Sequence, residues 1–124
     1  MDVTPLIPAD RQVIDSYGAQ GFHVSGAGYG GAILVFPDMT MAWPVNGLGD
    51  VTAESLRPVV EHGGIEILLL GCGRRMQPAP SALRQALRRA GIVLEIMDTG
   101  AACRTYNVLL AEERRVAAAL LPPG

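Results

Sequence analysis

The chain has 124 residues, a length that fits one domain, and 49% of them are hydrophobic while 18% are charged. This composition supplies enough apolar side chains for a core and excludes an intrinsically disordered chain. The formal net charge of -2 argues against a nucleic-acid-binding protein, because such proteins need a basic face to displace counterions from phosphates.

The N-terminal half reads as β-structure separated by turns. Two short strands, at residues 12–17 and 22–24, are joined by a Gly-Ala-Gln-Gly segment that suits a hairpin turn. A glycine-rich, flexible break at residues 26–31 precedes a continuous apolar run at residues 32–36, which is typical of a strand covered on both faces. Residues 40–43 are expected to return antiparallel to that strand.

The C-terminal half alternates between helices and strands. A helix that starts near residue 52 and is shortened or kinked by Pro58 comes first. It is followed by a strand at residues 65–70, a helix at residues 81–90, a strand at residues 92–97, a helix after Asp98 and a strand at residues 116–121. This order predicts a single α/β domain with helices packed on a sheet and right-handed crossovers, to which the first half adds an antiparallel β extension.

The cysteines and the N-terminal residues indicate the cellular compartment of the protein. Cys72 and Cys103 predict reduced thiols in a cytoplasmic protein, and neither belongs to a Cys-x-x-Cys pair. His23 and His62 lack the spacing of a zinc site, so we expect no metal and no cofactor. The first residues lack the regions of a signal peptide, and no apolar run is long enough to span a bilayer. We expect a soluble protein, with peripheral contact with the inner membrane left open.

Two loops follow the predicted parallel strands, where ligands bind in open α/β sheets. One loop holds Gly71, Cys72, Gly73, Arg74 and Arg75, and the other begins at Asp98 and Thr99. If the strands are neighbours, both loops border one cleft. The first loop could present backbone N–H groups to an anion beside its arginines. Alternatively, it is a tight turn that needs a positive φ, with its arginines solvated.

Asp98 and Arg104 each allow a structural and a functional interpretation. Asp98 suits the N-cap of the following helix, against the alternative of a catalytic carboxylate. Arg104 opposes the dipole of that helix, so it needs an acidic partner (Asp98, Glu95 or Glu66) or an anionic ligand. A hydrogen-bonded polar network that fixes the helix would explain these residues without any substrate.

The thiols also allow two interpretations. Cys103 lies near a helix N-terminus beside Arg104, a setting that can lower a thiol pKa. However, no histidine is near it in sequence to act as a base, and its place on an apolar helical stripe favours a buried small hydrophobe. Cys72 lies in a loop, where we expect an exposed thiol.

Several segments together resemble a known family. The resemblance covers residues 14–122 and rests on the segments 28–35, 43–45, 68–73 and 97–112, of which the last is the most specific. The chain is similar to the small Mth-like α/β domain family that includes the mitochondrial respiratory complex I assembly factor and the adipogenesis-associated Mth-like domain protein. The resemblance implies a three-layer α/β/α domain with a mixed sheet, in which at least one strand runs against the others. It implies no catalytic activity and no cofactor, and it carries over only a shared cleft at Gly71, Gly73, Asp98, Thr99 and Arg104.

Two functions follow as hypotheses. The first is a non-enzymatic interaction or assembly protein whose partners include subunits of a respiratory complex. It predicts an exposed apolar patch around Trp43 and Leu48. The second is a binder of, or enzyme acting on, a small anionic ligand in the cleft at Gly71, Asp98 and Arg104.

Overall fold

The N-terminal part of the chain forms a small antiparallel sheet in the computed structural model, which describes residues 7–124. Its strands are β1 (Ile14–Gly18), β2 (Gly21–Val24) and β3 (Ala27–Gly30), in the order β1-β2-β3. The glycine-rich segment was expected to be a flexible break, and that prediction is wrong, because its backbone pairs with β2 from Ala27 opposite Val24 to Gly30 opposite Gly21. Glycines with positive φ, Gly26 and Gly31, flank the strand and allow the chain to turn at both ends.

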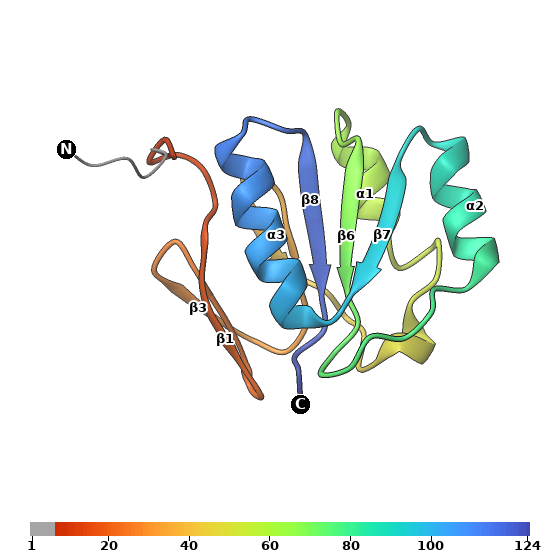
Figure 1. Cartoon of the computed structure of the whole chain (residues 1–124), viewed down its shortest axis with the longest axis horizontal. Helices are drawn as coiled ribbons and strands as arrows, with labels where there is room; N and C mark the ends of the chain where they lie inside the picture. The colour runs from red at the N-terminus through yellow and green to blue at the C-terminus, as the bar shows by residue number, and fades with distance from the viewer. Residues whose placement is uncertain (1–6) are drawn as a thin grey trace.

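A five-stranded mixed sheet forms the centre of the molecule (Figure 1). Its strand order is β5-β4-β8-β6-β7, with β4 at Ile33–Val35, β5 at Thr40–Ala42, β6 at Ile67–Gly71, β7 at Val93–Met97 and β8 at Val116–Leu120. Strands β7, β6 and β8 run parallel, whereas β4 runs antiparallel to both β8 and β5. The expected mixed sheet is therefore confirmed, and β4 is the strand that runs against its neighbours.

The two faces of this sheet bury different partners. On one face Leu34, Leu68 and Leu70 pack against α1 (Arg57–His62) and α2 (Ser81–Arg89). On the other face Ile33, Leu69 and Ala118 pack against α3 (Thr99–Ala111), and the small sheet adds Phe22 and Val24 to the same cluster. Figure 1 shows α3 and the small sheet side by side on that face. The three-layer α/β/α arrangement with an N-terminal β extension is thus confirmed.

Helix α1 begins later than its sequence pattern indicates. Residues 53–56 form turns, and the helix starts at Arg57 with Pro58 in its first turn. Proline is accepted there because the first N–H groups of a helix have no intrahelical partner. Pro58 therefore lies at the start of the helix and does not interrupt it.

Trp43 is part of the core, so the predicted exposed patch around Trp43 and Leu48 is wrong. The side chain of Trp43 is 3% exposed, and its indole N–H donates to the carbonyl of Ser55 at 2.8 Å. Leu48, in the short helix η1 (Leu48–Asp50), is half-buried and packs against the same core. The loop after β5 folds over the tryptophan and satisfies its one donor, which removes the patch from the surface. None of the helices within residues 7–124 is both long and apolar enough to cross a membrane.

Candidate functional site

The two loops expected to border a cleft do lie side by side. Strands β6 and β7 are parallel neighbours, and Gly71 lies opposite Met97. Beyond the strands the loops remain paired, since the Cys72 N–H donates to the Met97 carbonyl at 2.9 Å and the Thr99 N–H donates to the Gly73 carbonyl at 2.8 Å. The carboxyl ends of the parallel strands therefore form one junction.

Thr99 ties this junction together. Its side chain is fully buried; Oγ1 donates to the Leu121 carbonyl at 2.6 Å and accepts from the Gly73 N–H at 2.9 Å. Leu121 in turn donates its N–H to the Gly71 carbonyl at 3.0 Å. One threonine hydroxyl thus connects the segments that follow β6, β7 and β8.

Gly71 leaves no space for a ligand at the centre of the junction. A Cβ atom at this position would lie 3.0 Å from the Thr99 Cα and 3.0 Å from the Leu120 Cδ2. The glycine is needed because the backbone of α3 approaches β6 this closely. Gly73 has a φ of 109°, as expected for a tight turn. The start of α3 therefore packs directly against the end of β6 at Gly71.

Asp98 is the N-cap of α3. Its carboxylate accepts a hydrogen bond from the Ala101 N–H at 2.9 Å, while its backbone is extended. This is the geometry that satisfies an otherwise unpaired N–H at a helix start, and it favours the structural interpretation of this residue.

Within residues 7–124 Arg104 does not form an ion pair, so none of the acidic partners suggested for it (Asp98, Glu95 and Glu66) pairs with it. Instead its Nη1 donates to the Tyr17 hydroxyl at 3.1 Å. The cause is Gly100: a Cβ there would lie 2.6 Å from the Tyr17 hydroxyl, so the missing side chain lets β1 bring the tyrosine onto the first turn of α3. The guanidinium stays at the surface.

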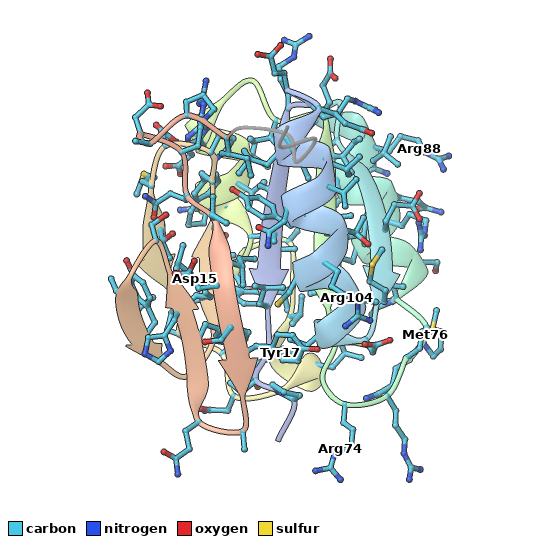
Figure 2. All side chains as sticks on the ribbon, turned by 60° about the vertical axis from the view of Figure 1, so that its left-hand side comes forward. Asp15, Tyr17, Arg74, Met76, Arg88 and Arg104 are labelled. Carbon is cyan, nitrogen blue, oxygen red and sulfur yellow. The ribbon has the colours of Figure 1, made fainter. Side chains whose placement is uncertain are left out.

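An exposed, cationic surface surrounds the junction. It consists of Tyr17, Arg74, Arg75, Met76 and Arg104, and we call it the arginine edge. Figure 2 shows Tyr17, Arg104, Met76 and Arg74 in the lower half of the molecule. Tyr17 is 41% exposed and Met76 is 60% exposed, and Arg74 Nη2 donates to the Gly124 carbonyl at 3.2 Å. Such a surface can pair its guanidinium groups with carboxylates while its two apolar side chains supply contact area.

The two thiols are both buried. For Cys103 this agrees with the sequence, and burial raises the pKa of its thiol to about 12 although Arg104 lies nearby. Cys72 was expected to be exposed, and that prediction is wrong, because the loop folds over it and leaves it 4% exposed. Its Sγ donates to the Arg75 carbonyl at 3.2 Å and accepts from the Gln77 N–H at 3.3 Å. Because its thiol is buried and has a raised pKa, Cys103 is a poor nucleophile.

The sequence analysis missed a hollow at the opposite end of the parallel strands. It has a volume of about 360 Å³ and includes Arg11, Asp38, His62, Glu113 and Arg114 in its lining. The Nε2 of His62 lies 2.7 Å from Asp38 Oδ1. The two adjacent arginines after α3, Arg114 and Arg115, are the sequence feature that marks this hollow. No pattern in the sequence connects these arginines with His62.

Comparison with known proteins agrees with the architecture. The chain is 38% identical over 112 residues to the zebrafish (Danio rerio) NADH dehydrogenase [ubiquinone] 1 alpha subcomplex assembly factor 3, a match that covers 90% of this chain and 64% of the relative. It is 41% identical over 112 residues to an uncharacterised Rhodobacter capsulatus protein, covering 90% and 86% of the two chains. The solution structure of a Bordetella pertussis Mth938-like domain superimposes with a TM-score of 0.82 at 32% identity and covers all of this chain and 94% of that one.

The family assignment rests on nearly the whole domain. The family model described as "Protein of unknown function (DUF498/DUF598)" matches residues 14–121, from the first residue of β1 to the residue after β8. The chain spans less than two thirds of the length of the zebrafish assembly factor. The protein therefore belongs to the DUF498/DUF598 family, and its homologues include complex I assembly factor 3.

Proposed function

We propose that this chain is a non-enzymatic protein that binds a protein partner and assists the assembly of a membrane respiratory complex of the complex I type. The observation that carries the proposal is the 38% identity to a complex I assembly factor over 90% of this chain. The family match covers both sheets and all three described α-helices, so the proposed role is attributed to this domain.

The chemistry of the carboxyl-end junction supports a role without catalysis. Thr99 uses its hydroxyl to join three strand ends, Asp98 uses its carboxylate to cap α3, and the Cys103 thiol is buried with a raised pKa. Each of these groups is occupied by a structural contact. A nucleophile or general base needs a free lone pair directed at a substrate.

The arginine edge is the surface we propose for the partner. Arginine, tyrosine and methionine are enriched in the cores of protein interfaces, and this surface presents all three residue types. Because its charged members are Arg74, Arg75 and Arg104, charge complementarity favours an acidic segment of a partner protein. Tyr17 holds one nitrogen of the Arg104 guanidinium, which presents the side chain in a fixed position. This surface replaces the patch at Trp43 and Leu48.

The test is recovery of tagged protein from its own host after gentle solubilisation of the membranes. We expect respiratory-complex subunits to be recovered with the wild-type protein and lost with Arg74→Glu/Arg104→Glu. The control is Arg88→Glu/Arg89→Glu, which makes the same charge change on the exposed face of α2. Recovery of the same subunits with both double variants would contradict the proposed surface. Wild-type protein that recovers no respiratory-complex subunit would contradict the proposed function.

A further inference from the structure

The hollow at the amino ends of the parallel strands has the size of a small-molecule site. Four segments enclose it: the loop before β1, the loop between β4 and β5, the end of α1 with Gly63 and Gly64, and the turn between α3 and β8. Its volume of about 360 Å³ lies within the range of known ligand pockets. It lies at the end of the sheet opposite the arginine edge, because β6 and β8 both start beside it.

His62 forms a rigid, charged part of the wall. Its Nε2 lies 2.7 Å from Asp38 Oδ1, and its Nδ1 lies 2.9 Å from the Gly63 carbonyl oxygen. Both neighbours are acceptors, so both ring nitrogens donate only when the ring is an imidazolium. The ring also stacks on Phe36, with centroids 4.4 Å apart and an angle of 3° between the planes. This arrangement fixes the ring, and the protonated ring neutralises Asp38.

The remaining charges favour an anion. Arg11, Arg114 and Arg115 all line the hollow, and Arg115 is paired with Glu66 through a contact of 2.7 Å between Nη2 and Oε1. With Asp38 balanced by His62, the lining retains the guanidinium groups of Arg11 and Arg114 against the carboxylate of Glu113. Guanidinium groups from two separate loops can hold one carboxylate or phosphate between them.

Glu113 adds an acceptor to the wall. It follows the C-cap of α3 with a φ of 61°, a left-handed conformation in which glycine is the usual residue. A non-glycine residue held in this conformation costs stability, and such residues gather at functional sites. Its carboxylate can accept a hydrogen bond from a hydroxyl or amine on a bound molecule.

We propose that this hollow binds a small molecule that carries both an anionic group, carboxylate or phosphate, and a hydroxyl or amine donor. Arg11 and Arg114 bind the anionic group, and Glu113 accepts a hydrogen bond from the donor. The site is independent of the proposed partner surface, since the two share no residue.

An NMR titration of the isotopically labelled protein tests the proposal, with inorganic phosphate and O-phosphoserine as probes. We expect both probes to shift the amide signals of Gly63, Gly64 and Arg114, and phosphoserine to bind more tightly because its amine reaches Glu113. In Arg11→Gln/Arg114→Gln, binding of either probe should weaken about tenfold or more. In Glu113→Ala, which removes the acceptor oxygens, the preference for phosphoserine over phosphate should disappear.

The control is Arg88→Gln/Arg89→Gln, which removes two guanidinium groups from α2 without touching the hollow. It should leave both affinities unchanged. Absence of shifts at the hollow in the wild-type protein would overturn the proposal. Equal weakening by Arg88→Gln/Arg89→Gln and by Arg11→Gln/Arg114→Gln would also overturn it, since the probes would then report only overall charge.

Discussion

The two ends of the parallel strands differ in how their polar groups are used. At the carboxyl ends, Gly71, Gly73, Thr99 and Leu121 bond to one another and leave no space between the strands. At the amino ends, the segments before β6 and β8 are still joined by the Glu66 N–H, which donates to the Arg115 carbonyl at 2.9 Å, but a hollow of about 360 Å³ lies beside them. In open α/β sheets ligands bind at the carboxyl ends. In this protein the polar groups at the carboxyl ends already bond to one another, and the hollow lies at the amino ends instead.

This difference shows that strand polarity alone does not locate a site. A loop at a strand end can hold a ligand only where its donors and acceptors are still available. In this chain, Thr99 and the Asp98 cap use those groups at the carboxyl ends, and only the surface around them, the arginine edge, stays available for contact.

The largest expected effect comes from breaking the carboxyl-end junction. Thr99→Val keeps the shape of the side chain but leaves the Gly73 N–H and the Leu121 carbonyl without their partner. One buried and one half-buried group left unsatisfied should lower the free energy of unfolding by about 3 kcal/mol. Urea unfolding measures this change.

Thr105→Val is the matched control, because Thr105 lies on the same helix and is half-exposed. It should change the free energy of unfolding by no more than about 0.5 kcal/mol. If the two variants were equally stable, the hydroxyl of Thr99 would not be what holds the junction, and the contrast between the two ends would fail.

A smaller effect of opposite sign is expected at the amino ends. Glu113 adopts a φ of 61°, so Glu113→Gly should raise the free energy of unfolding by about 1 kcal/mol. Glu112→Gly is the control, since Glu112 has a φ of -86° and a glycine there should slightly lower stability. A gain only at position 113 would show that the carboxylate at the hollow is kept at a cost in stability. A loss at position 113 would mean that this side chain stabilises the fold.

Much of the fold could be predicted from the sequence, because long apolar runs mark buried strands and the stripe of Leu83 and Leu87 marks α2. The loops after β6 and β7 were expected to border one cleft only if the two strands are neighbours, and the structure meets that condition. Strand β3 was missed because its residues are small and carry little apolar signal, and it forms by pairing its backbone with β2.

The candidate sites were harder to predict, because their contacts join distant segments. Arg104 bonds to Tyr17 only because Gly100 leaves space, and Trp43 is buried only because the loop ending near Ser55 folds over it. The hollow joins Arg11, Asp38, His62 and Glu113 from four separate segments. No local pattern connects such residues, so spacing rules find the turns and caps and miss the hollow.

The smallest expected effect is a pH dependence that belongs to the amino end alone. Burial opposes the charge on His62, but the hydrogen bonds to Asp38 and Gly63 outweigh it and raise the pKa of His62 above its ordinary 6.5. The hydrogen bond from His62 lowers the pKa of Asp38 below its ordinary 3.8. The His62 contribution to stability is therefore fully present below pH 6.5 and is lost as pH rises through the folded pKa. The Asp38 contribution is present above pH 3.8 and is lost as pH falls through the lowered pKa.

Between about pH 6 and pH 8, the wild-type protein should therefore lose stability, and His62→Asn should lose less. The effect is small because the Asp38 side chain is 62% exposed and solvent screens the pair. Melting temperatures across this range measure the slopes. The contacts of Thr99 involve a hydroxyl and backbone groups, which do not titrate between pH 6 and pH 8. If His62→Asn kept the full pH dependence of stability, the His62–Asp38 pair would not be its source, and this prediction would fail.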